Sequence, residues 1–177
     1  MSNTYSLKDG RKYTIRNVIP EDASNLIDYL ALISGESDNL TFGSGELTIT
    51  IEDEMKFIEN AIKSNNQYFI IAEKDGLLIG SMNFTGGTKP RLAHIGEFGV
   101  SVRKDYWGNG IAYEMMSLLI KWARENKITK INLQVREDNE RAINLYKKFG
   151  FEIEGLERRS FLIKGEYYNS CNMGLIV

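Results

Sequence analysis

The sequence predicts an α/β fold, in which a single domain contains a central, mostly antiparallel mixed sheet of about seven strands with helices on both faces. Hairpins toward the start and at the end of the chain, with strand–helix–strand units between them, favour this arrangement. A length of 177 residues suits one domain with a substantial core, and no internal repeat or low-complexity linker divides it. Residues 1–177 are therefore expected to fold as one unit.

The first half of the chain contains two predicted helices and three predicted strands. Pro20, followed by two acidic residues, opens a helix that is expected to end near residue 33, since acids favour a first turn. Thr50 and Asp53 resemble a capping box for a second helix through residue 62. Segment 34–44, rich in Ser, Gly, Asn and Asp, is predicted to be a loop. The expected strands are 12–18, 68–72 and 77–84, the last two joined at Asp75-Gly76.

The second half of the chain has two further helices and ends in a hairpin. The helix after Gly108 carries one apolar stripe, so it is expected to pack on the sheet. The other helix covers residues 139–149, and Gly150 ends it, because glycine is common just past a helix end. The stripe comprises Ile111, Met115, Leu118, Leu119 and Trp122, and the expected strands are 93–102, 131–135, 151–162 and 167–176, with a turn at Lys164-Gly165.

Segment 100–112 reads as a strand end, a loop with two glycines and a helix start. Glycine lets main chain approach a ligand closely, and the first N–H groups of a helix have no partners inside it. The helix dipole also favours negative charge at that end. Gly108 and Gly110 therefore indicate a phosphate or pyrophosphate site. The loop has neither the Lys-Ser/Thr ending of a Walker loop nor the third glycine of a Rossmann turn.

Asn139 and Tyr146 lie seven residues apart, or two helical turns, on the helix predicted after strand 131–135. Both side chains then point from one face, about 10 Å apart along the axis, where one elongated ligand can meet them. Asn139 can also be a helix cap, and Tyr146 can also be a core aromatic on the stripe of Ala142 and Phe149. Both motifs are expected at the carboxyl ends of strands, where such sheets bind ligands.

Together these motifs resemble the GNAT superfamily of acetyl-CoA-dependent N-acetyltransferases. In that family the first motif has Gln or Arg, two residues, Gly, one residue, and then Gly or Ala. Gly110 and Ala112 match it, whereas Trp107 occupies the Gln/Arg position and removes one side-chain contact to the pyrophosphate. The resemblance includes segment 139–151, and the order of elements extends it to nearly the whole chain, which implies one GNAT domain over residues 1–177.

The resemblance implies which residues meet acetyl-CoA. The pantetheine arm is expected along residues 98–102 of the strand before the glycine loop, and a main-chain N–H near Val100 is expected to polarise the thioester carbonyl. Tyr146 is expected to protonate the leaving CoA thiolate, because the phenol has a pKa of about 10 and the thiolate is of similar basicity. The cofactor-binding residues implied are Phe98, Val100, Ser101, Val102, Trp107, Gly108, Asn109, Gly110, Ile111, Ala112, Asn139 and Tyr146.

The general base has two candidates, Glu97 and His94, on the strand before the glycine loop. Either can accept, directly or through water, the proton that a substrate ammonium loses before attack. They are three residues apart and so lie on opposite faces of a regular strand, but the resemblance implies a bulge there that breaks this parity. Either residue can instead bind the acceptor.

Composition excludes several function classes. The net charge of −2, without a basic stripe interleaved with aromatics, argues against nucleic acid. One cysteine, Cys171, allows no internal disulfide, and with a single histidine it argues against a zinc site. Apolar runs are far shorter than the roughly 20 residues of a membrane span, and no signal-peptide core is evident. The expected protein is cytoplasmic and metal-free, with neither nucleic-acid nor membrane partners.

The expected reaction is acetyl transfer from acetyl-CoA to a primary amine by direct attack in a ternary complex. A small or amino-acid-like acceptor is favoured over a peptide acceptor, and a homodimer is allowed. The alternatives are a protein N-terminal or lysine acetyltransferase, a non-catalytic CoA-binding module, and a nucleotide-binding protein. Acceptor selectivity is expected to come from loop 34–44, the strand around His94, and the tyrosines Tyr167 and Tyr168, and acids near the loop (Glu36, Asp38 and Glu46) can attract a cation.

Overall fold

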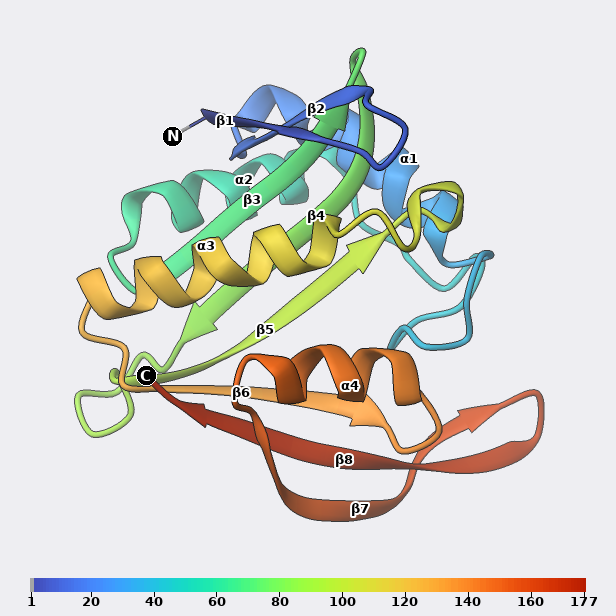
Figure 1. The fold of residues 1–177 in the computed structure, drawn as a ribbon, viewed down its shortest axis with the longest axis vertical. Coiled ribbons are helices and arrows are strands. Elements are labelled where there is room, and N and C mark those ends of the chain that lie inside the picture. The colour runs from blue at the N-terminus through green and yellow to red at the C-terminus, as the bar shows by residue number, and fades with distance from the viewer. Residues whose placement is uncertain (1) are drawn as a thin grey trace.

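The computed structural model describes residues 2–177 and shows helices on both faces of one sheet (Figure 1). The α-helices are α1 (Ala23–Ile33), α2 (Ile51–Lys63), α3 (Ile111–Glu125) and α4 (Glu140–Lys148), with 3-10 turns at Pro20–Asp22 and Lys104–Tyr106. The strands are β1 (Ser2–Ser6), β2 (Lys12–Asn17), β3 (Gln67–Lys74), β4 (Leu77–Gly86), β5 (Ile95–Val102), β6 (Lys130–Arg136), β7 (Glu152–Ile163) and β8 (Glu166–Ile176).

The eight strands form one mixed sheet in the order β1-β2-β3-β4-β5-β6-β8-β7. All neighbouring pairs are antiparallel except β5 and β6, which run parallel and are connected through α3. The predicted fold class is therefore confirmed. The strand beyond the seven predicted is β1, whose sequence is almost entirely polar. Its Tyr5 ring stacks on Tyr13 at 5.6 Å between centroids, which holds this edge strand on β2.

Local sequence signals explain where several elements begin and turn. Thr50 caps α2, because its Oγ1 accepts a hydrogen bond of 3.1 Å from the Asp53 N–H. The β3–β4 turn has Asp75 and Gly76 at φ values of 52° and 77°, the left-handed conformations that a two-residue hairpin turn requires. Lys164 and Gly165 adopt the same kind of turn between β7 and β8, at φ values of 51° and 85°. These three predictions are confirmed.

The two faces of the sheet bury separate hydrophobic cores. Helices α1 and α2 cover one face, where Leu26 and Ile58 pack on Phe69 and its neighbours. Helices α3 and α4 cover the other face, and Met115 and Tyr146 belong to that larger core (Figure 1). Because side chains alternate along a strand, β3 contributes to both cores, with Ile70 in the larger core and Phe69 and Ile71 in the smaller one.

Strands β5 and β6 pair only at their N-terminal ends and then diverge (Figure 1). The parallel pairing joins Ile95–Glu97 to residues 130–132 and stops at Glu97. On its other edge, β5 pairs with β4 without a register shift from Gly96 to Val102. The bulge expected near His94 and Glu97 was therefore wrong: β5 leaves β6 because the pairing ends, and no extra residue is inserted. The β6-facing main chain of residues 98–102 has no strand partner as a result.

No helix within residues 2–177 has both the length and the apolar character needed to cross a membrane.

Candidate functional site

A cavity of about 1390 Å³ opens where β5 and β6 diverge, and residues from both faces of the sheet line it. Glu97, Gly99 and Ser101 point toward the α1/α2 face, since they alternate with Phe98 and Val100, which belong to the core under α3 and α4. The Ser101 hydroxyl confirms this direction, because it lies 3.0 Å from the Tyr29 hydroxyl of α1. The cavity therefore connects the two layers through the gap in the sheet.

The glycine loop delivers an open helix N-terminus to this cavity. Gly108 and Gly110 adopt φ values of 79° and 82°, and a Cβ at either position would meet no atom within 4 Å. Gly110 is the N-cap residue of α3 and provides no side-chain cap, in contrast to Thr50 of α2 and Asn139 of α4. Within residues 2–177, no N–H group from Gly108 to Tyr113 donates a hydrogen bond. These donors and the helix dipole together suit an anion.

Trp107, at the Gln/Arg position of the motif, has a structural role and a charged neighbour. Its indole N–H donates to the Val102 carbonyl at 2.6 Å, which fixes the loop to the end of β5. The Arg141 guanidinium of α4 lies 4.8 Å from the centroid of the Trp107 ring, a cation–π contact. Both residues line the cavity. A positive charge thus stands next to the loop, although it comes from α4.

Asn139 and Tyr146 occupy the α4 wall of the cavity. The Asn139 side-chain carbonyl accepts a hydrogen bond of 3.2 Å from the Ala142 N–H, so it caps the helix. Tyr146 is 8% exposed, and its ring packs edge-on against Phe98 with centroids 5.9 Å apart. Burial raises the pKa of Tyr146 to about 12, so the phenol keeps its proton at neutral pH. Asn139 is therefore a helix cap and Tyr146 a core aromatic, and both residues also line the cavity.

Four acidic residues line the cavity, and two of them already have partners. Glu36 accepts a hydrogen bond of 2.7 Å from the Lys104 N–H, and Asp53 accepts one of 2.7 Å from the Thr50 hydroxyl. Glu97 and Glu54 have no side-chain hydrogen bond or ion pair within residues 2–177. Glu97 is exposed, whereas Glu54 is only 6% exposed, and burial raises the pKa of its carboxyl.

Two predicted site residues lie away from the cavity. His94 is exposed in the turn before β5, at the opposite end of this strand from the glycine loop, and only its carbonyl is engaged, by the Thr129 and Lys130 N–H groups. The Asn109 side chain accepts from the Lys8 N–H at 3.2 Å and donates to the Tyr106 carbonyl at 3.1 Å. Asn109 therefore fixes the loop to its surroundings. The other predicted residues all line the cavity.

Of the regions expected to select the acceptor, some line the cavity and others lie away from it. Loop residues 36, 37 and 39–42 line the cavity. Asp38 and Glu46 do not: Asp38 forms an ion pair with Lys164, and Glu46 accepts a hydrogen bond from the Gly43 N–H. The tyrosines of the terminal hairpin, Tyr167 and Tyr168, are not among the lining residues.

Sequence reasoning missed four charged residues of the cavity: Asp53, which it predicted only as part of a helix cap, Glu54, Arg141 and Lys148. A signal for Glu54 was available, because it shares the buried stripe of α2 with Ile58 and Ala61, at spacings of four and seven residues. An acid on the apolar face of an amphipathic helix is unusual unless something binds it. The two basic side chains, Arg141 and Lys148, come from α4, whereas the acidic side chains lie on the α1/α2 side. Opposite charges therefore line opposite walls of the cavity.

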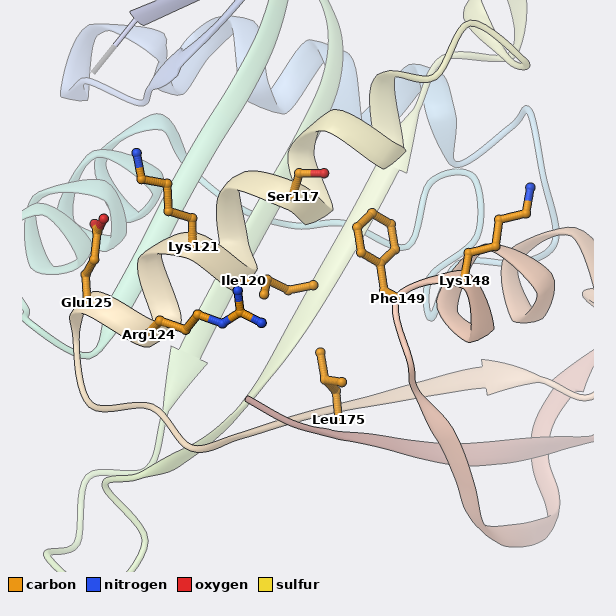
Figure 2. A pocket seen from close by; sticks show the side chains of 8 residues that line it. All are labelled: Ser117, Ile120, Lys121, Arg124, Glu125, Lys148, Phe149 and Leu175. Carbon is orange, nitrogen blue, oxygen red and sulfur yellow. The ribbon is translucent and has the colours of Figure 1, made fainter.

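A smaller hollow of about 480 Å³ lies between α3, the end of α4 and β8. Figure 2 shows Lys121 and Lys148 at its edges with their amines pointing away from each other, so they do not converge on one ligand. None of the predicted site residues lines this hollow. Within residues 2–177, no group of three or more His, Cys, Asp or Glu side chains is arranged to hold a metal ion.

Comparison with known proteins agrees with this geometry. Residues 36–151 match the sequence profile of the acetyltransferase (GNAT) family. The L-amino acid N-acetyltransferase AaaT of Escherichia coli strain K12 is 33% identical over 111 residues, which cover 60% of this chain and 67% of that protein.

Two solved structures extend the likeness to nearly the whole chain. A GNAT-family acetyltransferase from Streptococcus pneumoniae has a TM-score of 0.89 and 30% identity, over 93% of this chain and 99% of that one. The structure of yncA from Salmonella typhimurium, solved with its cofactor acetyl-CoA, has a TM-score of 0.81 and 17% identity, over 93% of each chain. At that identity the second likeness concerns the fold alone.

Proposed function

Because the chain belongs to the GNAT family of acetyltransferases, we propose that it transfers the acetyl group of acetyl-CoA to a primary amine. The resemblance carried by segments 107–112 and 139–151 is thereby confirmed, and the protein is an acyltransferase. The co-substrate, the acceptor and the residue roles are the proposal. The observation that carries it is the open N-terminus of α3, which faces the same cavity as Glu97 and Tyr146.

The α3/α4 end of the cavity suits the phosphates of acetyl-CoA. The N–H groups from Gly108 to Ala112 donate to no acceptor among residues 2–177, so they are available to the phosphates. The two glycines leave open space in which the phosphates can approach the main chain closely. Arg141 supplies a positive charge beside the loop that Trp107 cannot supply. The unpaired main chain of residues 98–102 suits the amide-containing pantetheine arm, which can pair with it as an added strand would. The yncA structure, which has the same fold, was solved with acetyl-CoA.

The amine enters from the α1/α2 face, opposite the phosphates. Bound acetyl-CoA supplies an acetyl group activated as a thioester. Glu97 accepts the proton of the attacking ammonium, directly or through water, and a main-chain N–H near Val100 stabilises the developing oxyanion. The N–C bond forms and the C–S bond breaks, and Tyr146 donates its proton to the sulfur. The second proton that the acylated nitrogen loses restores the Tyr146 phenol, so the products are the acetylated amine and the free CoA thiol.

Burial affects both partners of that last proton transfer. The pKa of about 12 means that Tyr146 is a weaker acid than a solvated phenol, which by itself would disfavour donation. The same apolar surroundings also destabilise a thiolate, whose basicity rises in parallel. Tyr146 therefore remains a competent donor when the sulfur becomes anionic inside the cavity.

The acceptor class is proposed to be a small or amino-acid-like amine, in line with the L-amino acid specificity that names the E. coli relative. The test measures release of the CoA thiol with small amines, amino acids and peptides, together with mass spectrometry of the product. We expect acceleration by at least one small amine and an acetylated product. Binding of acetyl-CoA without acceleration by any amine would indicate a non-catalytic CoA-binding module. Thermal stabilisation by ATP or NAD in place of acetyl-CoA would indicate a nucleotide-binding protein.

A further inference from the structure

Glu54 is a buried carboxylate that the proposed chemistry does not use. It is 6% exposed, lines the cavity from the first turn of α2, and its carboxylate has no hydrogen-bond or ion-pair partner within residues 2–177. Its oxygens are not among the fully buried polar atoms without a partner, so they keep contact with the cavity. A charged group held in such an enclosed place without a partner is costly, so a ligand that pairs with it is favoured. Its side chain is therefore available to a ligand.

Another buried carboxylate shows how this chain treats an acid with a structural role. Asp22 is 5% exposed and accepts hydrogen bonds of 2.7 and 2.8 Å from the Arg16 guanidinium and one of 2.9 Å from the Ile19 N–H. Its partners lower its pKa, whereas burial raises that of Glu54. Asp22 is satisfied by the protein, and Glu54 is not.

The surroundings of Glu54 indicate what kind of ligand would satisfy it. Leu30, Phe42 and Phe57 also line the cavity, and they come from α1, the loop that follows it and α2, so a ligand on this side meets apolar carbon as well as the carboxylate. Among residues 2–177, the only basic side chains that line the cavity are Arg141 and Lys148 of α4, so the α1/α2 wall has neither lysine nor arginine. A carboxylate with apolar neighbours and no protein counter-ion is complementary to a cation on an aliphatic chain.

We propose that Glu54 binds a second cationic group of the acceptor, so that the acceptor is an aliphatic diamine or a similar amine with a second ammonium or guanidinium group. The proposal rests on the acetyl transfer proposed above, and it gives the two unpaired carboxylates of the cavity different partners. Glu97 faces the amine that reacts, and Glu54 holds the far end of the acceptor. The two charges also fix which amine of an asymmetric acceptor is acetylated.

The test compares acceptors that differ only in the second charge: cadaverine with pentylamine, and hexamethylenediamine with hexylamine. In the wild type we expect kcat/KM for each diamine to exceed that of its monoamine by about tenfold or more, the strength of a charge-assisted hydrogen bond. In Glu54→Gln the ratio should fall to about the twofold that two equivalent amines give by statistics alone. Glu52→Gln is the matched control, because Glu52 lies on the same turn, is exposed and pairs with Lys56 at 2.9 Å, and it should keep the wild-type ratio.

Calorimetry with cadaverine and the protein–CoA complex separates this proposal from the proposed reaction. Cadaverine that binds the wild type and binds Glu54→Gln about tenfold more weakly supports the role of Glu54, even if no thiol is released, in which case the acetyl transfer fails alone. Equal kcat/KM for monoamines and diamines in the wild type, or an unchanged ratio in Glu54→Gln, overturns the role of Glu54 and leaves acetyl transfer intact. If cadaverine neither binds nor reacts, the role of Glu54 is overturned as well.

Discussion

The two ends of the cavity are built from different parts of the chain and by different means. The α3/α4 end uses main-chain N–H groups of one loop, Gly108–Ala112, and two turns of one helix, residues 139–146. The α1/α2 end uses side chains from separate segments, including Leu30 of α1, Leu40 and Phe42 of the loop after α1, and Glu54 of α2. The first end presents donors and positive charge, and the second presents carboxylates and apolar carbon.

This difference shows which kind of site a sequence reveals. A main-chain anion site needs glycines and a helix start within a few residues, so its signal is local and readable. A side-chain site assembled from distant segments has no fixed spacing, because only the fold brings its members together. The division also matches chemistry: a phosphate-bearing co-substrate can use general backbone donors, whereas one particular acceptor needs particular side chains.

The largest effect is expected where the two ends meet, at Tyr146. Tyr146→Phe keeps the ring against Phe98 and removes only the proton donor, so kcat should fall by about 100-fold while KM for acetyl-CoA changes little. Steady-state kinetics with a competent amine measure both values. Tyr146→Ala, with its melting temperature, is the companion variant, because a purely structural tyrosine predicts full turnover in Phe and damage only in Ala through the cavity left behind.

The next largest effect is expected at the α3/α4 end of the cavity, where we propose that the phosphates of acetyl-CoA bind. Gly110→Val places a branched side chain at φ 82° on the N-cap of α3, which blocks the approach of main chain to phosphate and strains the loop. We expect the affinity for acetyl-CoA to fall by about tenfold or more by calorimetry. Circular dichroism should show an unchanged helix content, since no protein atom lies within 4 Å of the added Cβ. A folded variant with wild-type affinity would remove the phosphate assignment.

The smallest effect concerns Glu54, at the α1/α2 end of the cavity, and the stability of the folded protein. Burial raises the pKa of Glu54 above its ordinary value of 4.5, so the folded state prefers the protonated carboxyl and loses stability as the pH rises through the folded pKa. Glu54→Gln should therefore stabilise the protein by about 0.5 kcal/mol at neutral pH, and the gain should vanish below about pH 4. Urea denaturation at the two pH values measures this difference.

Asp22→Asn is the contrasting variant, because its pKa is lowered by its partners and its ionised form stabilises the fold. It should destabilise the protein at neutral pH, and this loss should shrink as the pH falls through the folded pKa of Asp22. An ionised Glu54 that stabilised the protein as Asp22 does would mean that it has a structural partner.

The fold was predictable almost in full, because capping residues, hairpin turns and apolar stripes are local signals. β1 was missed because a polar edge strand carries almost no hydrophobic alternation, and only Tyr5 marks it. At the site, Gly108, Gly110 and Tyr146 reach the cavity as the motifs predicted. His94 does not, because β5 stays regular and begins only at residue 95. Glu54 could not be paired with Glu97 from sequence, because 43 positions separate residues that only the sheet and helix packing bring to one wall.

A crystal structure of the protein with CoA bound tests the division of the cavity most directly. We predict the pyrophosphate within hydrogen-bond distance of the N–H groups from Gly108 to Ala112, the arm alongside residues 98–102, and the thiol between Glu97 and Tyr146. CoA phosphates bound along the α1/α2 wall, or in the hollow beside Arg124, would contradict the account.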